Sequence, residues 1–158
     1  MKSLVVYYSY SGNTKKVAKV LVEALKAKGE VEELELVALD ESKSFLGQCS
    51  RAFKHVRANI KDVNFDLSKY DLICFGTPVW AFGPAPALNT YIDKCSGILG
   101  KNVIIFSTYG SGAGKDRCID YAKRILYDKG AVGFKRFSVQ QSNVDKKEFI
   151  INEISNII

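Results

Sequence analysis

The chain has 158 residues, of which 47% are hydrophobic and 25% are charged, as expected for a globular protein with a core of its own. No stretch approaches the roughly 18 uninterrupted apolar residues of a membrane-spanning helix, so we expect no membrane insertion and, without a cleavable signal, a cytoplasmic protein. The formal net charge of +6 favours acidic partners or anionic ligands.

Strand-like and helix-like patterns alternate along the chain. The first half holds an apolar strand, a helix that stops at a glycine and a strand with polar residues mixed in, over residues 4–8, 14–28 and 31–37. The second half holds strand, helix, strand, helix, strand and helix, over residues 72–75, 85–96, 103–106, 115–129, 134–139 and 145–157. This alternation predicts an α/β fold in three layers, with a doubly wound, five-stranded parallel sheet in a single domain over residues 1–158.

The polarity of the strands also predicts their order. Inner parallel strands are buried on both faces and are therefore apolar throughout, as are the first, third and fourth strands. The second and fifth strands carry charged residues, which places them at the edges: Glu32, Glu33, Glu35, Lys135 and Arg136. These positions select the order 2-1-3-4-5. In such a sheet a ligand binds where the chain reverses direction, beyond the carboxyl ends of the strands.

Three loops follow the inner strands and are expected to converge at that point. They read "SYSGNT" (9–14), "GTPVWAFG" (76–83) and "STYGSGAG" (107–114). The first loop is uncharged and combines hydroxyl and amide groups with Gly12 at the start of a helix, a combination that binds phosphate. The alternative is a cluster of residues that only caps the helix. A Walker A motif and the acidic residues of a response regulator are both absent.

The second and third loops supply aromatic side chains beyond the sheet. Trp80, Phe82 and Tyr109 are candidates to enclose a planar ring, although Trp80 and Phe82 also fit a core or lid position. The backbone from Gly110 to Gly112 is placed to contact the edge of a heterocycle. A phosphate site beside an aromatic slot predicts a mononucleotide with a flat base.

With these three loops the chain resembles the flavodoxin-like superfamily, and the resemblance spans essentially the whole chain. "SYSGNT" matches the phosphate loop of the family, [ST]-x-[ST]-G-x-T, and "GTPVW" and "STYGSGAG" fall at its two isoalloxazine loops. The resemblance implies FMN as the cofactor, with no catalytic acid or base and no metal. It implies cofactor contacts from Ser9, Tyr10, Ser11, Gly12, Asn13, Thr14, Thr77, Pro78, Val79, Trp80, Phe82, Thr108, Tyr109, Gly110, Ser111 and Gly112.

The resemblance leaves two redox functions open. One is an electron carrier that works through bound FMN between redox partner proteins. The other is an NAD(P)H-dependent FMN or quinone oxidoreductase, because "TPVWAFGPAPALNTYID" (77–93) is similar to such enzymes. Ordinary flavodoxins are usually acidic, whereas this chain is basic. Those carriers also often keep a glycine in the second loop whose peptide bond flips to stabilise the flavin semiquinone, whereas this loop has Pro78 early and Gly83 late. A third class, a cofactor-free nucleic-acid module, lacks any binding motif, so we expect no nucleic-acid partner. The oligomeric state is left open.

The long connection over residues 38–70 predicts an amphipathic helix. Its apolar face is formed by Leu46, Cys49, Phe53, Val56 and Ile60, and its basic face by Arg51, Lys54, Arg57 and Lys61. The basic face is expected to be solvated, with attraction of a nucleotide phosphate or an acidic partner as the alternative. His55 lies near its polar side and is not expected to be catalytic. Tyr7 and Tyr8 are expected to pack in the first strand, and the cysteines to be buried free thiols.

Overall fold

A computed structural model describes all residues from 1 to 158. The strands are β1 (Lys2–Tyr8), β2 (Glu30–Leu36), β3 (Leu72–Trp80), β4 (Gly83–Pro84), β5 (Asn102–Tyr109) and β6 (Val132–Gln140). The helices are α1 (Asn13–Lys26), α2 (Phe45–Phe53), α3 (Pro86–Lys94), α4 (Lys115–Asp128) and α5 (Lys147–Ser155), with a 3-10 turn over Gln141–Asn143. No helix has both the length and the apolar character that crossing a membrane requires.

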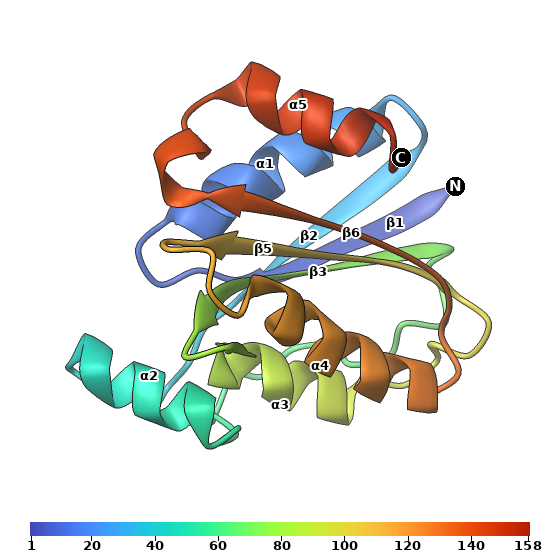
Figure 1. Ribbon diagram of the computed structural model, residues 1–158. Helices are drawn as coiled ribbons and strands as arrows, with labels where there is room; N and C mark the ends of the chain where they lie inside the picture. The colour runs from blue at the N-terminus through green and yellow to red at the C-terminus, as the bar shows by residue number, and fades with distance from the viewer.

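The sheet has the order β2-β1-β3-β5-β6, with every pair in this path parallel. The short β4 lies off the path and pairs antiparallel with β3. Helices α1 and α5 cover one face and α3 and α4 the other, which makes three layers, while α2 lies apart at one end (Figure 1). The predicted α/β fold and the predicted order 2-1-3-4-5 of the parallel strands are confirmed.

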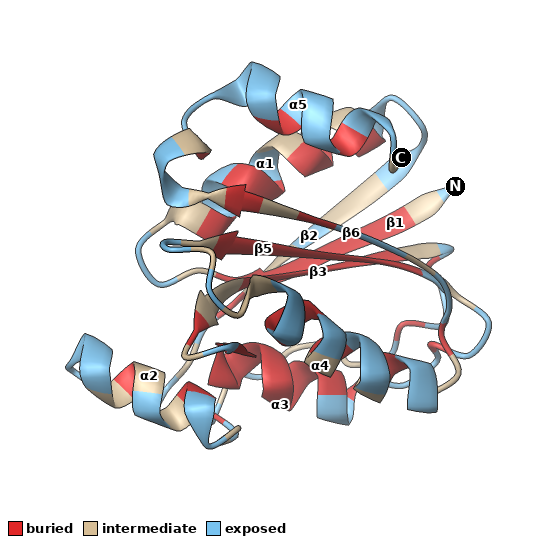
Figure 2. Ribbon diagram, viewed as in Figure 1, coloured by how far each residue is buried: buried red, intermediate tan, exposed pale blue.

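Burial follows the predicted division between inner and edge strands. The inner strands β1, β3 and β5 are buried along most of their length, whereas β2 and β6 are largely polar and partly exposed (Figure 2). One apolar core lies between the sheet and α3 and α4, and a second lies between the sheet and α1 and α5. Tyr7 and Tyr8 are both buried in β1, as predicted.

The glutamates of edge strand β2 are held by partners on both faces of the sheet. Glu33 accepts a hydrogen bond of 2.7 Å from the Tyr7 hydroxyl and pairs with Lys19 at 2.9 Å. On the other face Glu32 accepts hydrogen bonds from Tyr70 and Lys69, which lower its pKa to about 2. These contacts explain how a strand with charges at successive positions stays in the sheet.

Strand β3 is longer than the apolar run predicted. The run over 72–75 marks only its first half, and the strand continues to Trp80. Gly76 and Pro78 disfavour strands by intrinsic propensity, but pairing with β5 extends as far as Pro78 opposite Thr108. The cross-strand ladder overrides the propensity here, so Trp80 is held at the end of a strand and not in a free loop.

The predicted amphipathic helix of the long connection is wrong in its extent and in its packing. Helix α2 ends at Phe53, because His55 adopts a positive φ of 50° that a right-handed helix does not allow. Ile60 instead forms an isolated bridge with Ala38. On the predicted apolar face, Leu46 is 80% exposed and Phe53 61% exposed. The predicted basic face is also divided, since Arg51 pairs with Asp40 and Arg57 with Asp93.

Gly76 offers a direct test of the packing between β3 and β5. A Cβ atom at Gly76 would lie 2.2 Å from Cζ of Phe106, whose ring stacks on Phe137. We expect Gly76→Ala to lower the free energy of unfolding by about 1–3 kcal/mol, measured by denaturant titration, because this ring pair must shift. Gly110→Ala is the control, since its Cβ meets nothing closer than 3.8 Å. Equal losses in both variants would contradict the packing argument.

Candidate functional site

The loops that follow β1, β3 and β5 converge at one end of the sheet, as predicted, around a cavity of about 750 Å³. No lining side chain carries a charge. The lining consists of Tyr10, Ser11, Asn13, Thr14, Phe45, Cys49, Pro78, Val79, Trp80, Ala81, Phe82, Thr108, Tyr109, Gly110, Ser111, Gly112, Ala113 and Gln141. Of the residues predicted to contact a cofactor, all but Ser9, Gly12 and Thr77 line this cavity. For every one of them, contact with a ligand stays a prediction.

Helix α1 begins at the cavity with its first backbone N–H groups uncapped. Gly12 precedes the helix with a φ of 89°, which glycine adopts readily, and as the N-cap residue it has no side chain that could accept a hydrogen bond from the first turn. Ser9 accepts a hydrogen bond of 3.2 Å from the N–H of Lys15, so this hydroxyl does help to start the helix. The earlier N–H groups and the positive end of the helix dipole are left for an anion.

A buried pair of hydroxyl groups joins the first loop to the third. Oγ1 of Thr14 and Oγ1 of Thr108 lie 2.8 Å apart, and both residues are almost fully buried while lining the cavity. Two hydroxyls carry two protons, and the bond between them uses one. The pair therefore keeps one O–H donor for a ligand, which is the requirement for binding a phosphate oxygen.

The two lysines at the start of α1 are engaged away from the cavity. Lys15 pairs with Glu35 at 2.6 Å and Lys16 pairs with Asp145 at 2.7 Å. Such exposed pairs contribute little to stability, but they hold both ammonium groups against carboxylates outside the cavity. The phosphate-binding capacity of the cavity therefore rests on backbone and hydroxyl dipoles.

Trp80 stands at the centre of an aromatic cluster in the cavity wall. Its ring meets Tyr8, Tyr10 and Phe45 edge to face, at centroid distances of 5.6, 5.5 and 6.2 Å. Trp80 is only 4% exposed, whereas Tyr10 and Phe45 are 43% and 55% exposed. The burial of Trp80 fits the anchor position that the sequence offered as an alternative, but Trp80 also lines the cavity, so its contact with a ligand stays a prediction. The more exposed rings of Tyr10 and Phe45 line the same cavity.

Comparisons with known proteins agree with this geometry. Residues 2–130 match the family model described as Flavodoxin. The chain belongs to the flavodoxin family.

Solved structures extend the likeness beyond the matched residues. A flavoprotein from Lactobacillus acidophilus NCFM, determined in complex with FMN, is 23% identical, with a TM-score of 0.63 over 93% of this chain and 98% of its own. Oxidised flavodoxin 1 from Bacillus cereus is 18% identical, with a TM-score of 0.60 over 100% and 99% of the two chains. An NADH:FMN oxidoreductase in its apo form is 18% identical, with a TM-score of 0.65 over 99% and 88%. At these identities the likeness shows the fold.

In this flavodoxin-family chain the loop after β3 is a tight hairpin with a strained backbone. Trp80 pairs with Gly83, so Ala81 and Phe82 form a two-residue turn between β3 and β4. Both turn residues have positive φ, 44° and 69°, in a conformation that asparagine and glycine favour. The hydroxyl of Thr77 accepts a hydrogen bond of 2.9 Å from the N–H of Ala85 and so helps to fix the hairpin. Strain of this kind is typical of ligand-binding loops.

The loop after β5 is held by residues from the neighbouring strand. The side-chain amide of Gln140 donates a hydrogen bond of 2.9 Å to the carbonyl of Gly110. Gly112 has a φ of 86°, and a Cβ there would lie 3.5 Å from the Tyr109 ring. Tyr109, Gly110, Ser111 and Gly112 therefore line the cavity from a loop that is held in place by its neighbour.

Five lining residues were not predicted from the sequence: Phe45, Cys49, Ala81, Ala113 and Gln141. Ala81 and Ala113 lie within predicted loops but carry no side chain that signals a contact. Gln141 follows the fifth parallel strand, so the expected convergence of strand ends offered a signal that was not used. Phe45 and Cys49 belong to α2, whose position no local pattern indicates.

Burial raises the pKa of the Cys49 thiol, so it is protonated at neutral pH.

The strained turn leads to a stability prediction. We expect Ala81→Gly to raise the free energy of unfolding by about 1 kcal/mol, because glycine accepts a positive φ without steric cost. Ala113→Gly is the control, since Ala113 is not among the residues with positive φ, and it is expected to be neutral or destabilising. Denaturant titration measures both changes. A loss of stability in Ala81→Gly would show that the turn is not strained.

Proposed function

We propose that the chain binds FMN in the cavity and transfers electrons through it. The observation that carries this proposal is an uncharged cavity in which a free helix N-terminus and the Thr14–Thr108 hydroxyl pair lie across from an aromatic wall. A flat ring that ends in a phosphate is the ligand that fits both halves. Family membership and the FMN held by the Lactobacillus flavoprotein support the same choice.

The residues divide into two groups by what they offer to FMN. The phosphate is assigned to Ser11, Asn13, Thr14 and the first N–H groups of α1, whose dipole favours an anion. The ring system is assigned to the cluster around Trp80 on one side and to Tyr109 with the backbone of the third loop on the other. Bound FMN would supply the one- and two-electron redox chemistry that these side chains lack.

The chain itself sets the environment in which that chemistry takes place. The aromatic and aliphatic wall excludes water and disfavours any added negative charge on the ring. The N–H groups of the third loop oppose that effect, because they can donate to atoms that become negative. The balance between the two determines the reduction potential, and both contributions come from fixed backbone and buried rings.

The first candidate source of electrons is a redox partner protein, as for a carrier. A second candidate, NAD(P)H, is favoured by two features. Phe82 is 43% exposed at the rim, and the arginines that surround His55, beside the adjoining Gly83, include two without carboxylate partners. The likeness to an NADH:FMN oxidoreductase agrees with it. The two candidates are compatible, since one chain can accept a hydride from NAD(P)H and pass electrons to a protein.

We also propose a cytoplasmic location. Cys49, Cys74, Cys95 and Cys118 are all free thiols, which an oxidising compartment does not favour. The expectation that the chain does not bind nucleic acid stays a prediction, and a mobility-shift assay with duplex DNA at varied salt tests it.

The phosphate assignment is tested at Thr14. We expect Thr14→Val to weaken FMN binding by roughly 1–3 kcal/mol, or about 5- to 150-fold, because a phosphate oxygen loses its donor. Titration of the apo-protein, followed by quenching of flavin fluorescence, measures the affinity. Thr90→Val is the matched control, since Thr90 is buried in α3 and donates to the Ala58 carbonyl at 2.7 Å, outside the cavity. Unchanged affinity in a folded Thr14→Val protein would remove Thr14 from the site.

The electron source is tested by rapid mixing without oxygen. We expect the visible flavin absorbance of the FMN-loaded protein to fall after mixing with NADPH, because Phe82 is exposed at the rim and His55, near arginines without carboxylate partners, lies close to the adjoining Gly83. A parallel mix with NADH compares the two dinucleotides. If absorbance persists with both while dithionite still reduces the flavin, then NAD(P)H is not the donor and a protein donor is required.

A further inference from the structure

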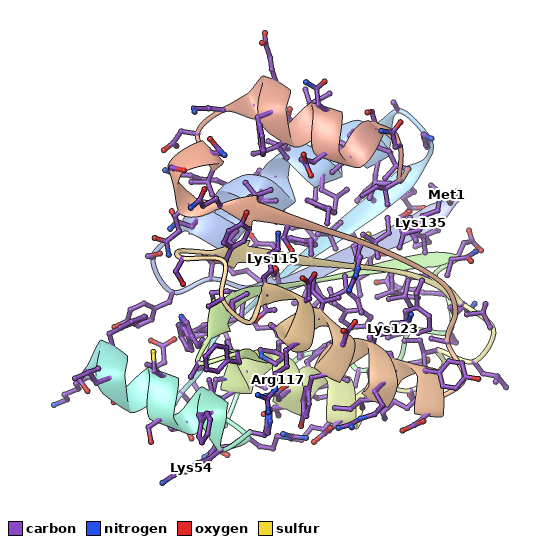
Figure 3. The ribbon with its side chains drawn as sticks, viewed as in Figure 1. Met1, Lys54, Lys115, Arg117, Lys123 and Lys135 are labelled. Atoms are coloured by element: carbon purple, nitrogen blue, oxygen red, sulfur yellow. The ribbon has the colours of Figure 1, made fainter.

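A group of cations lies between the end of α2 and one side of α4, outside the cavity. It contains Arg57, Arg117 and Arg124, gathered around the rings of His55 and Tyr121. We call these five residues the arginine cluster. Figure 3 shows Arg117 on the side of α4 that faces α2 and α3, while Lys123 of the same helix lies toward the edge of the sheet.

The two rings form the floor of the arginine cluster. The imidazole of His55 stacks on the ring of Tyr121, with centroids 4.1 Å apart and an angle of 4° between the planes. Nδ1 of His55 is buried without a hydrogen-bond partner, so Nε2 is the nitrogen left for a ligand. Burial, and then the nearby guanidinium groups, lower the pKa of His55. His55 also keeps a positive φ of 50°, which marks a fixed and strained position.

Two of the three arginines are not neutralised by any carboxylate. Arg57 pairs with Asp93 and also lies 3.4 Å from the Tyr121 hydroxyl. Arg117 forms no salt bridge, and the Arg124 guanidinium, which forms none either, lies 5.7 Å from the Tyr121 ring centroid. Because the acidic residues of the first turns of α4 pair with Arg136 on another side, nothing in the arginine cluster offsets these two charges.

The arginine cluster adjoins the hairpin that carries Phe82 of the cavity wall. A Cβ atom at Gly83 would lie 3.4 Å from the imidazole of His55, and Gly83 follows Phe82 of the cavity lining. Phe82 packs so closely on Gly114, the N-cap of α4, that a Cβ there would lie 2.1 Å from its ring. Arg117 is in the first turn of α4, just beyond Gly114. A ligand that enters the cavity over Phe82 therefore passes the arginine cluster.

We propose that the arginine cluster binds a phosphate group of a nicotinamide dinucleotide whose ring lies over the cavity. This inference rests on the second candidate for the electron source. Guanidinium groups present planar pairs of N–H donors that match phosphate oxygens, and two uncompensated arginines suit the charge of a phosphate. The stacked rings hold His55 so that its free nitrogen adds one more contact. The phosphate is either the 2′-phosphate, present only in NADP⁺, or the diphosphate that NAD⁺ shares.

The test is a calorimetric titration of the FMN-loaded protein with NADP⁺ and with NAD⁺ at fixed low ionic strength. We expect the double variant Arg117→Ala/Arg124→Ala to bind NADP⁺ at least about tenfold more weakly than the unchanged chain, the loss expected for about 1.4 kcal/mol. Lys123→Ala is the control for the loss of a cation from α4 outside the arginine cluster, although it removes one charge and the double variant removes two; Lys123 lies over the Phe134 ring on the other side of the helix. FMN affinity is measured for each variant and is expected not to change.

The outcomes are distinct. Loss of NADP⁺ binding alone assigns the arginine cluster to the 2′-phosphate, and equal loss for NADP⁺ and NAD⁺ assigns it to the diphosphate. The inference is overturned if neither dinucleotide binds the FMN-loaded chain, or if the double variant binds both as tightly as Lys123→Ala does. A chain that does not take up FMN would instead refute the proposed function. The FMN titration reports that failure separately.

Discussion

The reversal of chain direction between β1 and β3 is the constraint on which the candidate site depends. Helix α1 leaves β1 toward one face of the sheet, and the segment after β3 leads to α3 on the other face (Figure 1). The ends of these neighbouring strands therefore separate, and a cavity opens between their loops. Its walls are extensions of the most deeply buried strands, so the position of each loop is determined by the two apolar cores.

Charge is distributed in an unusual way around this cavity. The chain is basic, yet the cavity is lined only by neutral groups, and the nearest lysines of α1 are held by Glu35 and Asp145. A neutral cavity with oriented dipoles can bind an anion without a charged side chain, and its counter-ion, in the site. The arginine cluster adds positive charge beside the hairpin that carries Phe82, where it can draw an anionic ligand toward the opening over a distance of about a Debye length.

The sequence predicted the sheet well because its signals there are local and physical. Unbroken apolar runs marked β1, β3 and β5, and the glutamates of β2 marked an edge, so the order and the convergence of the loops followed. The errors have a different cause. Helix α2 was extended past His55, because periodicity cannot indicate a residue held at positive φ by its neighbours. The place of Phe45 beside Trp80, and the stack of His55 on Tyr121, depend on contacts between segments distant in the chain. The β3–β4 hairpin is local, but its turn residues Ala81 and Phe82 are not of the types that signal a positive φ.

The row of glutamates on β2 has a further consequence for how molecules meet one another. The outer edge of β2 has unpaired backbone groups, and an exposed edge of this kind can add to the sheet of another molecule. Two β2 edges brought together would take these charged side chains and their lysine partners out of water, which is costly. Glu32 and Glu33 stay ionised because tyrosine and lysine partners lower their pKa. The contacts that hold the edge strand in its own sheet therefore also keep ionised, hydrated side chains along the edge, and these oppose aggregation through it.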